Sequence, residues 1–438
     1  MPSGKSSREY FATRIGFVLA AAGSAVGLGN MWRFPYQTAE GGGAAFVVLY
    51  ILMTFLIGVP IMTSEFIIGR SAKRSPIGAF RFIGGSGWVP VGYLVVFAPF
   101  LILVYFSVIS GWTLRYAIDA ITGFSVDPVA RFAEISSGPP AILYHLILMA
   151  VTTAVVMRGV RGGIERAALI LMPVLFVMIV GLVAWATTLP GSGQGYEFYL
   201  RPSITALSDP TVIKQAAAQA FLSLSVGMGV MITYASYLDR SNDLTQQAIT
   251  VSMLDFSVAF LGGLIVFPVI FALGLSDQLG ESTIGALFIS IPAAFIEMGV
   301  VGQVVGFVFF STLLVAALTS SFSLLEVVVA SLMDELKLKR RKSALIAGIV
   351  AAAAGILPAS SQSALGIMDK LAGEVFVVAG ALGSVLLAGW VLKDPLSELL
   401  TGASSFFARL ASGLLLVIRY LVPAFIAIVL WYSIKSIW

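Results

Sequence analysis

The chain has 438 residues, of which 58% are apolar and 11% are charged, and its mean hydropathy is +0.98. Charged residues make up about a quarter of a typical soluble domain, so this composition excludes a soluble globule and indicates a lipid environment. The lack of cysteine and the single histidine, His145, exclude disulfide frameworks, cysteine nucleophiles and clusters of His or Cys that bind metals.

The net charge of +4 comes from short groups of Lys and Arg between apolar runs. This pattern is typical of membrane topology, and we expect a lipid bilayer and no nucleic acid among the partners. A membrane span needs about 20 apolar residues. Eleven runs meet this description, at 13–37, 42–69, 90–123, 141–157, 166–188, 211–238, 246–273, 301–333, 344–357, 374–392 and 412–434.

Most Lys and Arg fall on one side of these spans, which predicts a cytoplasmic N-terminus. With eleven spans the C-terminus then lies outside, and a multi-pass protein of the bacterial inner membrane is expected. The first run starts after a polar segment and has no small-residue cleavage site, so it is not a signal peptide. The loops at 124–140, 189–210 and 274–300 mix Pro, Gly and short apolar pieces, which predicts partial helices around an outer vestibule.

Two of the spans contain glycine-rich interruptions, GSAVGLGN at 23–30 and SLSVGMG at 223–229. Small residues alone are also compatible with close helix packing. However, the interruptions lie in the first and the sixth span, which are matching positions if five helices are repeated with inverted topology. Broken helices expose backbone groups that lipid cannot satisfy, so they must line a cavity that holds ions or solute.

An all-α polytopic membrane fold follows, with a 5+5 inverted repeat, one further helix, and first and sixth helices unwound at mid-membrane. The expected layout is a cytoplasmic segment at 1–12, helices 1–5 at 13–188, an extracellular loop at 189–210, helices 6–10 at 211–392, and helix 11 with the C-terminus at 393–438. A third feature is the run of hydroxyls in AALTSS at 316–321. Hydroxyls inside a helix often bond to their own carbonyls, but beside two unwound helices neutral oxygens favour a small hard cation such as sodium.

These segments resemble the neurotransmitter:sodium symporters, which share the leucine-transporter fold, over nearly the whole chain and with the helix number of the bacterial branch. The motifs that carry the resemblance are ATR at 12–14, GLGNMWRFP at 27–35, EGGG at 40–43, GGIER at 162–166, ITYASY at 232–237, LTSS at 318–321 and DELKL at 334–338.

The resemblance implies two sodium sites. The second site would use carbonyls of Gly23, Val26 and Ala316 and the hydroxyls of Thr319 and Ser320. The first would use the Ala25 carbonyl, the Asn30 amide oxygen, Ser223 and, in the seventh span, Asp255.

The resemblance also implies a site for a small zwitterionic solute. The carboxylate would bind the amides of Leu28 and Gly29 and the first sodium, and the amino group would bind Ser225 and nearby carbonyls. The remaining residues expected around the solute are Ala25, Gly27, Ile102, Phe106, Leu222, Met228, Ser320, Ser321 and Leu324.

Two charge pairs are implied as gates. The outer gate would pair Arg33 with Asp369, and the inner gate would pair Arg8 with Asp334, with Tyr237 nearby. Glu65 would brace the unwound part of the sixth helix. Glu326 has no assigned role, and His145 is expected at the membrane interface.

The sequence departs from the family pattern around the solute. Gly27 stands where monoamine transporters carry Asp, which favours a ligand with its own carboxylate. Phe106 stands at the family's Tyr position, with Tyr105 one place earlier, and one helical position is a rotation of about 100°. Leu222 and Met228 replace aromatic residues, so an apolar and adaptable subsite is expected.

Asp255 bears on whether transport requires chloride. The chain keeps Tyr50, Gln219 and Ser223 at the positions around the chloride of animal members, and Asp255 adds a fixed negative charge there. A buried carboxylate neutralises sodium as an anion would, so we expect no chloride requirement.

The leading interpretation is a sodium-coupled symporter that imports an apolar amino acid by alternating access. A sensor of the same fold remains an alternative, as does a symporter of a β-amino acid or an amino sulfonate. An enzyme is disfavoured because no nucleophile–base pair or metal cluster occurs in the spans. A channel is disfavoured because broken helices with two gates suit alternating access.

Overall fold

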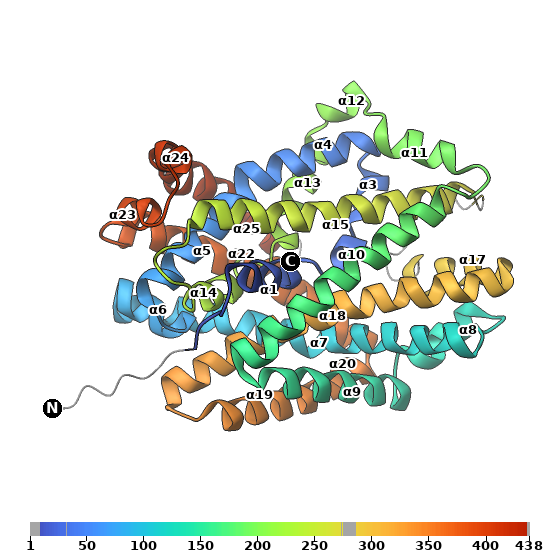
Figure 1. Cartoon of the computed structure of the whole chain (residues 1–438), viewed down its shortest axis with the longest axis horizontal. Coiled ribbons are helices and arrows are strands. Elements are labelled where there is room, and N and C mark those ends of the chain that lie inside the picture. Colours follow the sequence, from blue (N-terminus) through green and yellow to red (C-terminus); the bar gives the residue numbers. More distant parts are fainter. Residues whose placement is uncertain (1–8, 32, 273, 275–285, 436–438) are drawn as a thin grey trace.

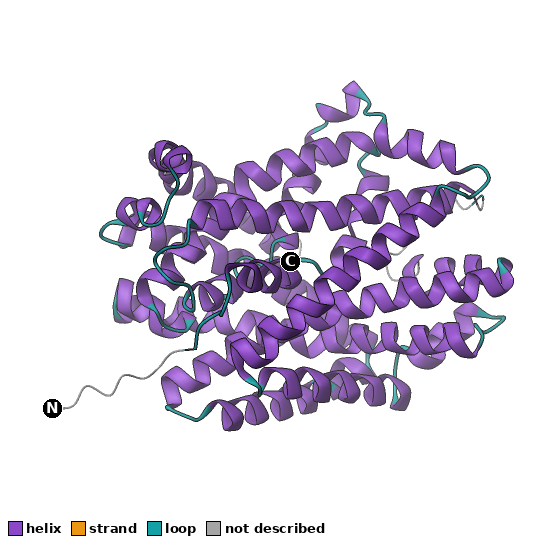
Figure 2. Ribbon diagram, viewed as in Figure 1, coloured by secondary structure: helices purple, strands orange, loops and turns teal. Residues whose placement is uncertain are grey.

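In a computed structural model of the chain, the described residues are 9–31, 33–272, 274 and 286–435. These residues form helices and loops and contain no strand (Figure 2). The helices run mostly along one direction of the molecule, and the first described residues lie toward one end of it (Figure 1). This end is called the N-terminal side below, and the other end the opposite side.

Nine continuous helical segments are long and apolar enough to cross a membrane among the described residues, at Ala44–Ala72, Ser86–Thr122, Pro139–Val156, Val160–Ala186, Leu244–Ala272, Gly299–Leu336, Arg340–Ser360, Gln362–Val391 and Ser405–Lys435. They agree with nine of the eleven predicted spans. The other two predicted spans are the interrupted ones, and both are broken in the structure.

The first half of the chain contains α1 (Arg14–Ala25), α2 (Leu28–Met31), α3 (Arg33–Glu40), α4 (Ala44–Met53), the π-turn η1 (Thr54–Gly58), α5 (Val59–Ala72), α6 (Pro76–Gly84), the 3₁₀ turn η2 (Ser86–Trp88), α7 (Val89–Thr122), α8 (Pro128–Ile135), α9 (Pro139–Val156), the π-turn η3 (Val160–Glu165) and α10 (Arg166–Ala186).

The second half begins with α11 (Ser192–Leu200), α12 (Ile204–Leu207), α13 (Pro210–Ser223), α14 (Val230–Ala235), α15 (Leu244–Ala272), η5 (Ala286–Ser290), α17 (Ile291–Glu297), α18 (Gly299–Leu336), α19 (Arg340–Ala354) and α20 (Ile356–Ser360). It ends with α21 (Gln362–Asp369), η6 (Lys370–Phe376), α22 (Val377–Leu386), η7 (Leu387–Val391), α23 (Pro395–Leu400), α24 (Ser405–Leu416), η8 (Val417–Leu421) and α25 (Val422–Lys435).

Short helices fill the three long loops, as predicted, with α8, α11, α12 and α17 on the opposite side (Figure 1). Local capping explains where several helices begin. Asp209 accepts a hydrogen bond from the Thr211 backbone N–H at 2.7 Å, and Pro210 occupies the first turn, so α13 starts where its free amides are satisfied.

The long helices α7 and α18 pack along each other through the centre of the molecule. The largest hydrophobic cluster spans α1, α7, α10, α14, α18 and α22 and surrounds the two interruptions. The described residues therefore hold the unwound segments inside an apolar surrounding, where free backbone groups must find partners within the protein.

Candidate binding site for sodium and solute

The first interruption separates α1 from α2. α1 ends at Ala25, and Val26 takes an extended conformation with φ −66° and ψ 103° before α2 begins at Leu28. Carbonyls near the end of α1 therefore have no intrahelical donor and face the interior.

The second interruption lies between α13, which ends at Ser223, and α14, which begins at Val230. Three residues within it have positive φ, Ser225 at 52°, Gly227 at 80° and Gly229 at 68°. The Ser225 hydroxyl donates to the Ser24 carbonyl at 2.8 Å, so the two interruptions contact each other directly.

Glu65 of α5 braces the second interruption, as predicted. Its Oε1 accepts a hydrogen bond from the Gly227 backbone N–H at 2.7 Å, and the side chain is fully buried. Gly227 also lies so close to α22 that an added Cβ would be 2.1 Å from the Val377 carbonyl oxygen. Only glycine fits here, because both the positive φ and the close approach exclude a side chain.

The five groups expected at the second sodium site come together. The Ser320 hydroxyl oxygen lies 3.4 Å from the Gly23 carbonyl, 3.3 Å from that of Val26 and 3.1 Å from that of Ala316. The Thr319 hydroxyl is 3.0 Å from the Ala316 carbonyl. Two hydroxyls and three carbonyls from α18, the end of α1 and the first interruption thus form a compact set of neutral oxygens, which is the donor set that a hard cation prefers.

The groups expected at the first sodium site also cluster, around Asp255 of α15. The Asn30 amide nitrogen donates to Asp255 Oδ1 at 2.7 Å, and the hydroxyls of Ser223 and Tyr50 donate to Oδ2 at 2.8 Å and 3.2 Å. The Asn30 amide oxygen accepts from the Gly27 N–H at 3.0 Å. Asp255 is fully buried, and these three donors partly compensate its charge.

A cavity of about 400 Å³ lies between the interruptions and extends past Arg33 and Asp369 toward the opposite side. Nearly all the residues expected around the solute line it, namely Ala25, Gly27, Leu28, Gly29, Ile102, Phe106, Ser225, Met228, Ser320 and Leu324. Ser321 does not line it, since its hydroxyl bonds back to the Ala317 carbonyl at 2.8 Å. The Leu222 side chain lies outside the described part of the chain.

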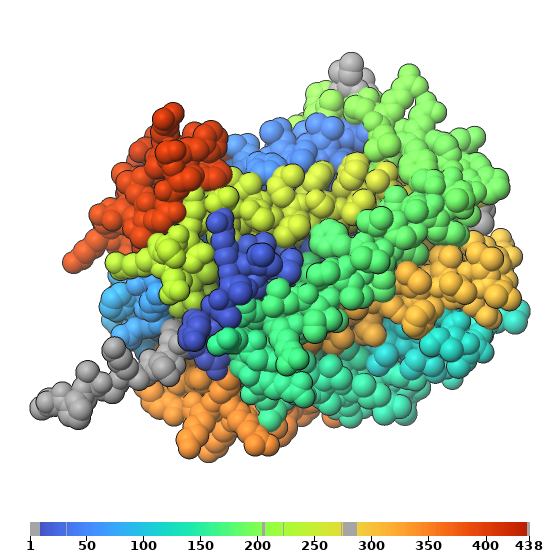
Figure 3. All heavy atoms as spheres, viewed as in Figure 1, coloured from blue at the N-terminus to red at the C-terminus, as the bar shows by residue number. Residues whose placement is uncertain are grey.

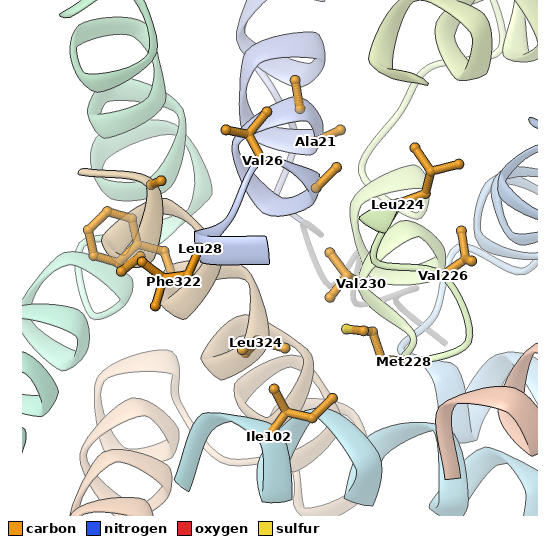
Figure 4. Packing of buried hydrophobic residues seen from close by; sticks show 14 of the residues in the cluster. Ala21, Val26, Leu28, Ile102, Leu224, Val226, Met228, Val230, Phe322 and Leu324 are labelled. Carbon is orange, nitrogen blue, oxygen red and sulfur yellow. The ribbon is translucent and has the colours of Figure 1, made fainter. Parts of the chain in front are cut away.

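The apolar part of this cavity comes from the two interruptions and from α7 and α18 (Figure 4). Met228 of the second interruption lies near Leu324 of α18 and Ile102 of α7, whereas the Leu28 side chain of the first interruption points toward Phe322. A side chain at Gly27 would place its Cβ 3.2 Å from the Ser320 hydroxyl, so glycine keeps this end of the cavity open.

Tyr105 and Phe106 both line the cavity, although they are neighbours on α7. The Tyr105 side chain interacts electrostatically with Asp369 and Arg33, which lie beside it. The hydroxyl that Phe106 lacks is therefore present one residue earlier and is directed to the outer end of the cavity. Arg33 and Asp369 flank this end without an ion pair within 4.0 Å among the described residues, which leaves the cavity open there.

The N-terminal side is closed by a charged network around Glu326. The fully buried Glu326 pairs with Arg340, which also pairs with Glu9 at 3.0 Å. The Tyr237 hydroxyl donates to Glu326 Oε1 at 2.7 Å. Asp334 accepts from the Ser75 backbone N–H at 2.6 Å, while its expected partner Arg8 lies outside the described residues.

No role for Glu326 could be assigned from the sequence, and Arg340 belongs to the group of basic residues at 337–342 that supports a cytoplasmic N-terminus. A buried acidic residue in a span did signal a missing partner. The identity of this partner could not be predicted from the sequence, because Arg340 belongs to a run of exposed basic residues and only the fold turns its side chain inward.

The expectation for His145 is wrong. Its side chain is fully buried between α7 and α19, with Nδ1 2.9 Å from the Ser107 hydroxyl and Nε2 2.9 Å from the Ala352 carbonyl. Polar partners on both neighbouring helices draw the imidazole into the helix interface, and hydropathy alone does not show them.

Unwound helices that share a central cavity with two sets of oxygen ligands define a multi-pass membrane transporter. The chain belongs to the Sodium:neurotransmitter symporter family, whose model matches residues 8–126 and 136–437. It is therefore a sodium-dependent transporter, not an enzyme.

Relatives of nearly full length support this assignment. The sodium-dependent transporter YhdH of Bacillus subtilis is 35% identical over 92% of this chain and 90% of its own. The sodium-dependent transporter MJ1319 of Methanocaldococcus jannaschii is 35% identical over 89% of this chain and 84% of its own. The crystal structure of MhsT in complex with L-phenylalanine matches with a TM-score of 0.85 and 37% identity, over 97% of this chain and 99% of that one.

Proposed function

We propose that the protein imports a small zwitterionic solute, most favourably an apolar amino acid, together with sodium. The observation that carries the proposal is the convergence of the Ser320 hydroxyl on carbonyls of Gly23, Val26 and Ala316 directly beside the cavity. An ion bound there ties the end of α1 to α18 and so links sodium occupancy to the shape of the solute cavity.

Two sodium ions are proposed, one at Thr319 and Ser320 and one at Asn30, Ser223 and Asp255. The solute carboxylate would lie at the amides of Leu28 and Gly29, beside the sodium ion at Asn30, Ser223 and Asp255. The amino group would bind near Ser225. The charged amino and carboxylate groups of such a solute match the polar interruptions. Its apolar side chain matches the apolar wall of Ile102, Phe106, Met228 and Leu324.

MhsT, which is 37% identical, was solved with L-phenylalanine, and this supports an amino acid as the solute. A β-amino acid or an amino sulfonate would also present opposite charges at a similar spacing and remains the second candidate for the solute. The same fold acting as a sensor is the alternative function.

Transport would proceed by alternating access, with the inverted repeats at 13–188 and 211–392 moving against each other. The cavity is open past Arg33 and Asp369, and the side of Glu326 and Arg340 is closed. We therefore assign this arrangement to the outward-facing state of an inner-membrane protein with a cytoplasmic N-terminus and an external C-terminus.

The test is a thermal-shift screen of purified protein against the common amino acids, β-alanine and taurine, in sodium and in potassium buffer. A bound solute stabilises the folded state by mass action. An apolar amino acid should raise the melting temperature only in sodium. Stabilisation by no solute, or by the same solute equally in potassium, would contradict the proposal. Uptake of the best ligand into proteoliposomes then separates a transporter from a sensor.

A further inference from the structure

Glu165, the last residue of η3, holds the start of α1. Its side chain is 2% exposed, and its carboxylate accepts three hydrogen bonds from the segment that leads into α1. Oε2 accepts from the Ala12 N–H at 2.7 Å, and Oε1 accepts from the Thr13 N–H at 3.0 Å and from the Thr13 hydroxyl at 2.9 Å.

The local sequence is adapted to this contact. Thr13 is the N-cap of α1, and its hydroxyl oxygen also accepts from the Gly16 N–H at 2.9 Å. Gly16 makes room for the carboxylate, because an added Cβ would lie 2.0 Å from Glu165 Oε1. The negative charge also faces the positive end of the helix dipole of α1.

α1 connects this contact to the candidate sodium sites. The helix is 12 residues long, so its two ends are about 18 Å apart. Glu165 contacts one end, and the other end supplies the carbonyls of Gly23 and Val26 to the second sodium site. In Figure 3 the dark-blue N-terminal segment lies on the surface beside the green start of α10, so no other element covers it on this face.

We propose that Glu165 is a clasp that holds α1 against α10 while the N-terminal side is closed, and that breaking it is a required step in opening this side. The inference rests on the proposed function, because it assumes that α1 moves during sodium-coupled transport. It is separate from the gate of Arg8 and Asp334, since the clasp uses backbone donors of α1 and a carboxylate of α10's leading turn.

The clasp has a consequence for sodium binding. A contact that exists only in the closed state adds to the stability of that state. If the closed state becomes less populated, the apparent affinity of any ligand that binds this state falls. Loss of the clasp should therefore open the N-terminal side more often and raise the sodium concentration needed for half-saturation, although Glu165 touches no sodium ligand.

The experiment uses the full-length chain, which has no cysteine and accepts a single reporter. Val327→Cys is suitable, since Val327 is fully buried on α18 one turn beyond Ser323, whose hydroxyl contacts that of Ser24 at 2.7 Å. The rate of thiol labelling of this reporter is measured in proteoliposomes as a function of sodium concentration.

Glu165→Gln should increase the labelling rate in the absence of sodium about tenfold and raise the sodium concentration for half-protection by a similar factor, as a roughly tenfold shift between the two states requires. Gly16→Ala displaces the carboxylate from its donors and should produce the same changes, so it carries the test if Glu165→Gln does not fold. The matched control is Glu335→Gln, which removes a carboxylate that pairs with Arg81 on the same side without contacting α1.

The outcomes separate the clasp from the proposed function. If sodium does not protect the reporter in the otherwise native chain, the proposed function fails. If sodium protects it but Glu165→Gln and Gly16→Ala label at the native rate with the native sodium dependence, the clasp is wrong. If the control changes as much as the two variants do, loss of a charge on this side is responsible and the clasp is again wrong.

Discussion

Replacing Asp255 with serine should make transport depend on chloride. In the structure the carboxylate accepts from Asn30 at 2.7 Å, Ser223 at 2.8 Å and Tyr50 at 3.2 Å, and it is fully buried. The substitution removes a fixed negative charge and leaves three inward-facing donors with too few acceptors. A chloride ion can accept from all three donors and restore the charge.

The magnitude follows from Coulomb's law. A sodium ion about 4 Å from a carboxylate gains about 4 kcal/mol at an effective dielectric constant of 20, which corresponds to about a thousandfold in affinity. Sodium-driven uptake by Asp255→Ser should therefore be strongly reduced when gluconate replaces chloride, and largely restored in chloride. Native uptake should be the same in both anions.

Uptake is measured in proteoliposomes with matched anions on both sides, and Glu297→Gln serves as the control because it removes an exposed carboxylate at the end of α17, an element that holds none of these donors. Native transport that stops in gluconate would refute the reasoning. So would an Asp255→Ser protein that transports equally well in both anions.

Three further changes test the geometry of the site. Gly227→Ala should lower the free energy of unfolding by at least about 2 kcal/mol, because an alanine at positive φ is strained and its Cβ would meet the Val377 carbonyl. Unfolding monitored by fluorescence checks this, and a native-like stability would contradict it. Exchanging Arg33 and Asp369 should restore part of the uptake lost in either single variant, and no rescue with folded proteins would remove the pair as a gate. Phe106→Tyr adds a hydroxyl to the cavity and should change solute selectivity in the thermal-shift screen, whereas an unchanged ligand ranking would show that Tyr105 already supplies the polar contact.

Much of the fold was predictable because the bilayer imposes simple rules. A span must be long and apolar, and glycines in the middle of a span signal an interruption, so the segments at 23–30 and 223–229 were recognisable in the sequence. The hydroxyls of Thr319 and Ser320 were recognisable as candidate ion ligands for a similar reason, since polar groups at mid-membrane need a partner.

Other features depended on which way a side chain turns. Tyr105 and Phe106 differ by one helical position, and their sequence positions did not show that both reach the cavity. The partners of His145 and Glu326 are on helices distant in sequence, so only the packed structure reveals them. Hydropathy reports the environment of a residue type on average, and it does not report individual contacts.

The central claim is tested most directly by sodium-driven accumulation of the solute when its starting concentrations inside and outside are equal. Proteoliposomes containing the native protein are loaded with the solute identified by thermal shift, at the same concentration inside and outside, with potassium inside and equal pH and chloride on both sides. An inward sodium gradient should drive a net accumulation of solute, and this accumulation should collapse when a sodium ionophore is added. The double variant Thr319→Ala, Ser320→Ala should show no accumulation at sodium concentrations that saturate the native protein. Accumulation that is absent with the native protein, or that is unchanged by the ionophore, would contradict sodium-coupled symport.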